Sequence, residues 1–274
     1  MICQCFHLKE SYSFLGDNGC DPTVTMYAPD IIRPYTEQPR PSILICPGGG
    51  YSMCSDREAE PIALHFLPAG YNVFVLNYSV APNRYPTQLR EIAAVMELIH
   101  QNANVWHCDP YRVAIYGFSA GGHLAAHYST CYDCDDVRTC FPDSKPVQAT
   151  ILGYPVITAD ARYGHLGSFQ NLLGHCPNEQ SEIDAFSCER RVTEKAPPAF
   201  LWHTAADSAV PVMNTYLYAG ALSRFNIPAE VHVFPAGDHG LSTVDTQTNN
   251  ELPPAVARAH QWLRLAEEWL KYTL

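Results

Sequence analysis

The residues best placed to do chemistry lie in segment 117–122, Gly-Phe-Ser-Ala-Gly-Gly. The apolar run 112–116 precedes it and predicts a strand, and the residues after it have helical character. A sharp turn between a strand and a helix lifts a serine hydroxyl above the sheet, provided that the residues two positions away are small, as Gly117 and Gly121 are. The alternative interpretation is a glycine-rich turn with a solvated serine. We predict that Ser119 is a nucleophile for acyl transfer.

A nucleophilic serine needs a base and a carboxylate that orients this base. After a strand–serine–helix turn of this kind, the acid and then the histidine follow along the chain. Asp207 comes just after the predicted strand 199–203, and His239 lies between glycines after the next predicted strand. Asp160 holds a similar place after the preceding strand and is the alternative acid. Asp238 is adjacent to the histidine, and we expect it to be structural.

The developing oxyanion needs backbone N–H donors. Ala120 follows the serine directly, and the glycine loop 47–51 follows an earlier strand. A glycine triplet can also form a flexible turn or cradle a phosphate, but no lysine follows this one and the GxGxxG spacing is absent. We therefore predict that the N–H groups of Gly49, Gly50 and Ala120 form an oxyanion hole.

Predicted strands and helices alternate along the chain that positions these residues. Strands are predicted over 23–27, 42–46, 72–77, 112–116, 147–153, 199–203 and 229–234, and helices over 58–68, 86–102, 123–128, 212–225 and 253–272. This alternation predicts one α/β domain over 1–274, with a mostly parallel central sheet and helices on both faces. Segment 159–196 breaks the alternation with glycines, polar turns and short helical pieces. It predicts a small cap-like insertion over the sheet edge.

Composition and charge limit the partners. The net charge of −11 argues against nucleic acid and against an anionic membrane surface. No apolar run reaches membrane-spanning length, and the N-terminus lacks the basic and apolar regions of a signal peptide. We expect a cytoplasmic protein. The C-terminal helix or an edge strand could support a homodimer.

Eleven cysteines are scattered along a chain too long to need disulfides, so reduced thiols are expected. Cys131, Cys134 and Cys140 cluster near His127, which could indicate a zinc site or a redox pair. No second CxxC completes a four-cysteine set. We therefore predict no metal and no cofactor, with free thiols in the loop after the helix.

Five segments carry a family resemblance, namely 47–51 (PGGGY), 77–82 (NYSVAP), 117–123 (GFSAGGH), 197–204 (PPAFLWHT) and 235–241 (PAGDHGL). In these segments the chain resembles the α/β-hydrolase esterases, and most closely the bacterial acetyl-xylan and bifunctional feruloyl/acetyl-xylan esterases. The resemblance extends over nearly the whole chain. It implies the α/β-hydrolase fold, with Ser119 as nucleophile, Asp207 as acid and His239 as base. Pro47 stands where the hormone-sensitive-lipase group has histidine, which favours a compact esterase.

The resemblance implies a serine carboxylic-ester hydrolase that needs no cofactor. Its expected substrates are short-chain acyl esters, above all acetyl esters, of carbohydrates such as acetylated xylan oligosaccharides. Tyr51 and Phe118 are expected to line the pocket, and the insertion near 163–191 to form its wall. The alternatives are a feruloyl or aryl esterase, a short-chain lipase-like esterase, and a catalytically silent hydrolase fold used for binding.

Overall fold

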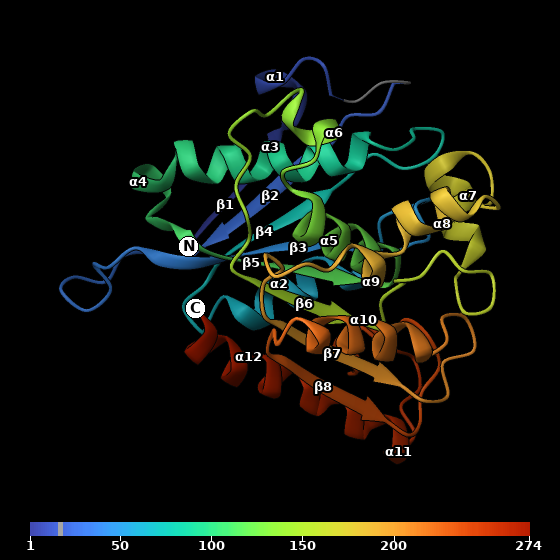
Figure 1. Ribbon diagram of the computed structural model, residues 1–274. Helices are drawn as coiled ribbons and strands as arrows, with labels where there is room; N and C mark the ends of the chain where they lie inside the picture. The colour runs from blue at the N-terminus through green and yellow to red at the C-terminus, as the bar shows by residue number, and fades with distance from the viewer. Residues whose placement is uncertain (16–18) are drawn as a thin grey trace.

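The computed structural model describes residues 1–15 and 19–274. Within them, eight strands form one sheet in the order β1-β2-β4-β3-β5-β6-β7-β8 (Figure 1). Strand β2 runs antiparallel to both of its neighbours, and all the other pairs are parallel. The bounds are β1 Ile2–His7, β2 Thr23–Ala28, β3 Arg40–Cys46, β4 Asn72–Asn77, β5 Cys108–Phe118, β6 Ala149–Gly153, β7 Ala199–Thr204 and β8 Ala229–Phe234.

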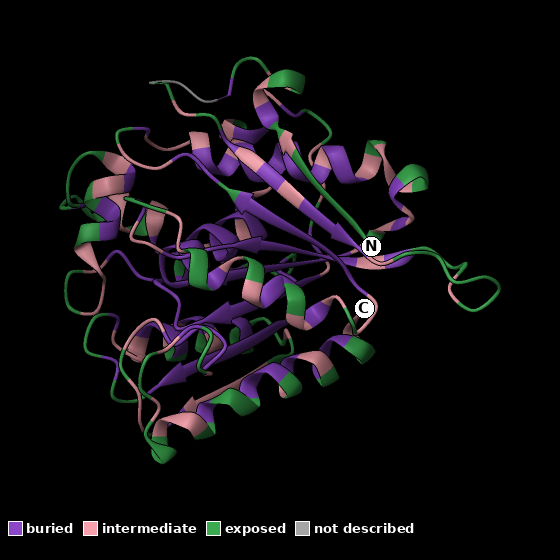
Figure 2. Cartoon of the chain, turned by 180° about the vertical axis from the view of Figure 1, so that it is seen from behind, coloured by how far each residue is buried: buried purple, intermediate pink, exposed green. Residues whose placement is uncertain are grey.

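Helices cover both faces of this sheet, and the alternation of side chains along β3 shows why. Leu44 and Cys46 pack into one core cluster, while Ile43 and Ile45 pack into the other. Buried residues are accordingly concentrated in the strands (Figure 2). The first cluster lies under α3 (Thr87–Gln101), α5 (Ser119–Cys131) and α10 (Met213–Arg224), and the second under α2 (Glu60–Phe66) and α12 (Trp262–Thr273).

The predicted order of strands and helices is present, with two differences. Strand β1 was not predicted, although its residues pair antiparallel with β2 throughout. The helix predicted over 253–272 is divided into three pieces, and in the middle piece, a 3₁₀ turn, His260 Nδ1 lies 2.7 Å from the carbonyl oxygen of Thr243. Its pieces are α11 Pro254–Ala257, η2 Arg258–Gln261 and α12. The remaining short helices outside the insertion are α1 Leu8–Ser11, η1 Asp56–Glu58, α4 Ala103–Trp106 and α6 Asp135–Arg138.

The insertion predicted over 159–196 contains short helices and lies on the side to which the parallel strands point (Figure 1). Val156, Phe169 and Val210 belong to a separate small apolar cluster that anchors it to the domain. Its helices are α7 Leu166–Leu173, α8 Gln180–Phe186 and α9 Cys188–Arg191. None of the helices among the described residues is both long and apolar enough to cross a membrane.

Candidate active site

The turn between β5 and α5 holds Ser119 in a left-handed backbone conformation, with φ of 52°. A Cβ at Gly117 would lie 2.1 Å from the carbonyl oxygen of Gly121, and a Cβ at Gly121 would lie 2.1 Å from that of Cys46. No side chain fits at those distances, so only glycine allows the turn to close against β3. The spacing seen in the sequence is therefore a packing requirement.

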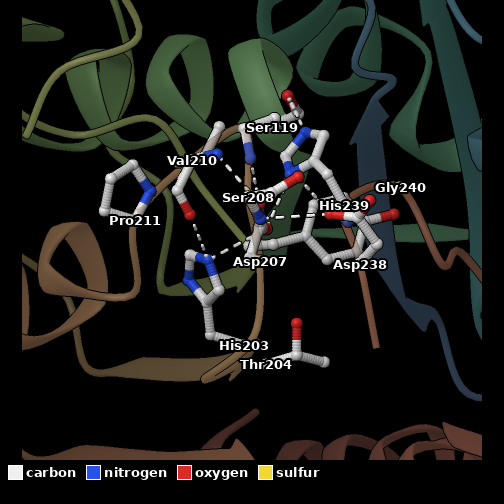
Figure 3. Close-up of polar contacts among 12 residues, drawn as sticks. Ser119, His203, Thr204, Asp207, Ser208, Val210, Pro211, Asp238, His239 and Gly240 are labelled. Carbon is white, nitrogen blue, oxygen red and sulfur yellow. Dashed lines mark hydrogen bonds and ion pairs between the residues drawn. The ribbon is translucent and has the colours of Figure 1, made fainter. Parts of the chain in front are cut away.

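Ser119, His239 and Asp207 form a continuous hydrogen-bonded chain (Figure 3). The serine hydroxyl donates to His239 Nε2 over 2.8 Å, and His239 Nδ1 donates to Asp207 Oδ2 over 2.7 Å. The alternative acid, Asp160, instead lies 3.8 Å from Arg190 on the surface. The geometry therefore selects Asp207 as the partner of the histidine.

Asp238 ties the acid loop to the histidine loop. Its Oδ1 accepts hydrogen bonds from the N–H of His239 (2.9 Å) and from the N–H and hydroxyl of Ser208 (3.1 and 2.7 Å). Because Ser208 is next to Asp207 in the chain, these contacts hold the acid and the base in register. Asp238 therefore has a structural role, as expected.

A second histidine, His203, also contacts the carboxylate, and sequence reasoning did not single it out. It is fully buried, with Nε2 3.2 Å from Asp207 Oδ2 and 2.9 Å from the carbonyl oxygen of Val210. Burial alone would raise the pKa of Asp207. The hydrogen bonds from His203 and His239, with the charge of His239 and the N–H of Val210, outweigh burial and hold this pKa well below its ordinary value. Asp207 therefore stays ionised.

The glycine loop is held through its carbonyl groups. The oxygen of Gly48 accepts the N–H of Ser55 (2.9 Å), and the oxygen of Gly49 accepts both the N–H and the hydroxyl of Ser52 (3.0 and 2.9 Å). In a trans peptide the N–H points opposite to the carbonyl, so these contacts also fix the N–H groups of Gly49 and Gly50. Among the described residues, those two N–H groups have no hydrogen-bond partner.

Gly49, Gly50 and Ala120 have backbone features that suit donors to an oxyanion, and their role stays a prediction. Gly49 and Gly50 both have positive φ (126° and 64°), and a Cβ at Gly49 would lie 2.2 Å from the carbonyl oxygen of Met53. Ala120 lies in the first turn of α5, where helix N–H groups lack an intrahelical acceptor. The structure brings two of these donors from the loop after β3 and one from the start of α5.

The expectation that Tyr51 and Phe118 line the pocket needs correction. Tyr51 is 1% exposed, and its hydroxyl lies 2.8 Å from His123 Nδ1, on the core side of the glycine loop. Phe118 is fully buried, because the alternation along β5 turns its ring toward Tyr116 and Trp262. Both residues support the site from behind and are not part of the cleft lining.

A cleft of about 490 Å³ opens over Ser119 and His239. The insertion contributes part of its wall, as expected, through His165, Gly167 and Asn171. No Phe, Tyr or Trp is among the described residues that line it. The other lining residues are Gly49, Gly50, Ser52, Met53, Ser55, Arg57, Glu58 and Gly240.

The cysteine cluster lies away from this cleft. Cys131 at the end of α5 is buried, with its Sγ 3.1 Å from Arg191 Nε, and His127 stacks on the ring of Tyr85. The cysteines are all free. Across residues 1–15 and 19–274, no group of His, Cys, Asp and Glu side chains is arranged to hold a metal ion.

Comparisons with known proteins find a family model, curated relatives and a solved structure that are similar to this chain. A family model described as BD-FAE matches residues 29–222. An endo-1,4-beta-xylanase B of Butyrivibrio fibrisolvens is 38% identical over 218 residues, which are 76% of this chain and 33% of that protein. An acetylxylan esterase of Xylanibacter ruminicola is 32% identical over 204 residues, 73% of this chain and 41% of that protein. The chain thus spans less than half the length of these curated relatives.

A solved structure is similar over nearly the whole of both chains. It is an acetyl ester-xyloside bifunctional hydrolase of Caldicellulosiruptor lactoaceticus, with a TM-score of 0.83 and 32% sequence identity. The match covers 98% of this chain and 96% of that one. With the strand order described above, this likeness confirms the predicted α/β-hydrolase fold.

Proposed function

From the premise that the chain belongs to the BD-FAE family, we propose that it is a serine carboxylic-ester hydrolase that removes acetyl groups from carbohydrates such as acetylated xylan oligosaccharides. The observation that carries the proposal is the hydrogen-bonded chain Ser119–His239–Asp207 beneath an open cleft. Two backbone N–H groups of the glycine loop are fixed beside it and have no partner among the described residues.

The reaction proceeds in two acyl-transfer steps. His239 takes the proton of the Ser119 hydroxyl as its oxygen attacks the ester carbonyl carbon. The N–H groups of Gly49, Gly50 and Ala120 stabilise the oxyanion. His239 then gives its proton to the leaving alcohol, and an acetyl-enzyme remains. Water attacks this ester while His239 takes one of its protons, and His239 returns that proton to the Ser119 oxygen as acetate leaves. Asp207 stays ionised and stabilises the imidazolium in both steps.

The lining of the cleft supports a sugar alcohol and a small acyl group. Ser52, Ser55, Arg57 and Asn171 offer polar groups to a hydroxyl-rich alcohol. A feruloyl group would meet no Phe, Tyr or Trp on which to stack among the described lining residues. A long acyl chain would find Met53 as the one large apolar side chain among them. One relative is named an acetylxylan esterase, and a similar solved structure is named an acetyl ester-xyloside bifunctional hydrolase.

The test is a p-nitrophenyl ester series of increasing acyl length, run beside acetylated xylo-oligosaccharides and methyl ferulate. We expect the highest kcat/KM with acetyl esters and release of acetate from the oligosaccharides. Each added methylene would add only ~0.8 kcal/mol of binding if an apolar pocket accepted it. A preference for acyl chains of about eight carbons, or for methyl ferulate, would overturn the acetyl assignment. Absence of hydrolysis of every ester would favour the silent binding fold.

A further inference from the structure

A buried acidic residue that the mechanism does not use lies in the cleft wall. Glu58, at the end of η1, is 3% exposed. Its Oε2 accepts the N–H of Gly48 over 2.8 Å, and its Oε1 accepts the hydroxyl of Tyr154 over 2.5 Å. A Cβ at Gly48 would lie 2.6 Å from Glu58 Oε2 and 2.9 Å from the Cβ of Ser119. The carboxylate and the nucleophile are therefore neighbours across Gly48.

Tyr154 carries this contact on to the loop that holds the catalytic histidine. Its hydroxyl oxygen accepts the N–H of Ser242 over 2.9 Å. Its ring packs edge-on against the His239 ring, with centroids 5.0 Å apart. An unbroken path of hydrogen bonds thus leads from Gly48 through Glu58 and Tyr154 to the histidine loop.

Arg57 makes a second link to the same loop. Its guanidinium donates to the carbonyl oxygens of Gly240 and Thr248, each over 2.8 Å, and its own carbonyl accepts the Ser242 hydroxyl. Ser242 and Val244 have left-handed backbones, with φ of 51° and 56°. Such conformations persist in residues other than glycine only where the surroundings fix them. At Ser242, the contacts with Arg57 and Tyr154 supply part of that fixation.

We propose that Glu58 is a positioning residue that couples the glycine loop (47–51) to the histidine loop (235–249). Its buried carboxylate also places a negative charge near His239, which becomes positively charged in the proposed reaction. Both groups in contact with Glu58 are donors, as an ionised carboxylate requires. The inference rests on the proposed function, since it presupposes that Ser119 and His239 perform catalysis.

Among the described residues, the charged and titratable groups that face Glu58 are His239, Arg57, Tyr154, Tyr78 and Tyr116. Burial raises the pKa of Glu58, while the hydrogen bonds from Tyr154 and Gly48 pull it partly back. Of the facing groups, His239 alone changes its charge during the proposed reaction. A neutral residue at position 58 should therefore change the pH dependence of catalysis.

The main experiment compares Glu58→Gln with Asp56→Asn, using p-nitrophenyl acetate between about pH 4 and 9. Asp56 is exposed in the same turn, and its substitution changes the net charge equally. For Glu58→Gln we expect kcat to fall about 10- to 100-fold with KM within about twofold. The acidic limb of the kcat/KM profile should move to lower pH, because the amide no longer stabilises the imidazolium. Asp56→Asn should match the wild type in both respects.

Tyr154→Phe separates the positioning effect from the charge. It keeps the carboxylate and removes the hydroxyl that links Glu58 to Ser242. We expect kcat to fall about 3- to 10-fold, with the acidic limb moved less than in Glu58→Gln, because the carboxylate remains and loses only one of the hydrogen bonds that lower its pKa. The double variant should lose less than the product of the two single losses, because both substitutions break one path. If Glu58→Gln does not fold, as judged by thermal unfolding, the kcat of Tyr154→Phe decides the matter.

The outcomes distinguish this inference from the proposed function. If the wild type hydrolyses p-nitrophenyl acetate, Ser119→Ala does not, and the substitutions at Glu58 and Tyr154 leave kcat and the acidic limb unchanged, the coupling is overturned and the esterase assignment stands. If the wild-type protein does not hydrolyse acetyl esters, the proposed function itself fails. Titration with a phosphonate that labels the active serine gives the concentration of competent sites for each kcat.

Discussion

The two walls of the cleft are built in different ways. On the chemical wall, Gly117 and Gly121 close a turn in which a Cβ would lie 2.1 Å from a carbonyl oxygen, and Gly49 is equally restricted. On the insertion wall, α7 packs on a small apolar cluster, and Asn171 donates one hydrogen bond over 2.8 Å to the carbonyl oxygen of Gly50. On the chemical wall, these positions accept only glycine. The insertion wall is held by apolar packing and by hydrogen bonds to the domain.

This difference assigns a separate duty to each wall. The chemical wall should govern kcat for every ester, because it contains the groups that touch the reacting atoms. The insertion wall should act on alcohol binding rather than on the chemistry, because it presents His165 and Asn171 to the cleft and contains no member of the Ser119–His239–Asp207 chain. Substitutions on the two walls therefore test the comparison, and the largest losses should come from the chemical wall.

Ser119→Ala should produce the largest loss. Removing the attacking oxygen eliminates the acyl-enzyme route, and we expect kcat to fall about 10⁶-fold for p-nitrophenyl acetate and for acetylated xylo-oligosaccharides alike. Initial rates and acetate release measure this loss. The substitution removes only the hydroxyl oxygen and adds no atom to the packed turn, so the melting temperature should stay near that of the wild type. A residual rate above about 1% would remove Ser119 as the nucleophile.

Asp207→Asn should cost somewhat less, with kcat about 10⁴-fold lower, because an amide at this position favours the wrong tautomer of His239. Initial rates with p-nitrophenyl acetate measure this. Asp160→Asn, at the alternative acid, is the matched control and should leave kcat unchanged, since Asp160 contacts Arg190 on the surface. A large loss of kcat in Asp160→Asn but not in Asp207→Asn would contradict the assignment of Asp207 as the acid.

The Asp207 carboxylate should also make the free energy of unfolding depend on pH. Because the folded-state pKa of Asp207 is depressed, its stabilising contribution is complete above its unfolded pKa of ~3.9 and is lost as the pH falls toward the folded value. The difference in free energy of unfolding between the wild type and Asp207→Asn should therefore shrink below about pH 4. Urea unfolding at several pH values measures it.

Gly49→Ala tests the backbone of the chemical wall without touching a catalytic side chain. Its Cβ would lie 2.2 Å from the carbonyl oxygen of Met53, so the loop must shift and move the N–H groups of Gly49 and Gly50. We expect kcat to fall about 10²- to 10³-fold with a small change in KM, as for the loss of an oxyanion donor. Gly220→Ala, on a helix with open space around its Cα, is the control and should be neutral. A kcat within about twofold of wild type would place the oxyanion hole elsewhere.

The chemical wall could be predicted from the sequence largely because its constraints are local. The spacing of Gly117, Ser119 and Gly121 follows from one tight turn, and the mostly parallel sheet follows from the alternation of strands and helices. The choice between Asp207 and Asp160 could not be made in the same way, since each follows a strand and a contact with His239 depends on the folded chain. Asp207 is the predicted acid and Asp160 the alternative, and the folded chain shows that Asp207 is the one in contact with His239.

Other residues show where prediction from the sequence failed. Tyr51 and Phe118 are adjacent to functional residues, but adjacency does not give the direction of a side chain, and both point into the core. Glu58 and His203 were not predicted because their partners are distant in the sequence or lie beyond a turn. The homodimer and the cytoplasmic location stay predictions.

His165→Ala should give the smallest effect and is the most informative about the insertion wall. His165 lines the cleft, and its Nδ1 lies 2.8 Å from the hydroxyl of Ser168. Burial and the nearby His239 lower its pKa, so the ring is neutral and can exchange one hydrogen bond with a sugar hydroxyl. Losing such a bond costs about 1 kcal/mol, so KM for acetylated xylo-oligosaccharides should rise about fivefold, while kcat/KM for p-nitrophenyl acetate stays within about twofold. His175→Ala is the matched control, because that histidine is exposed in the same insertion and pairs with Glu182 outside the cleft lining. An equal loss with both substrates would show that His165 supports the chemistry itself, and the division of duties between the two walls would then be wrong.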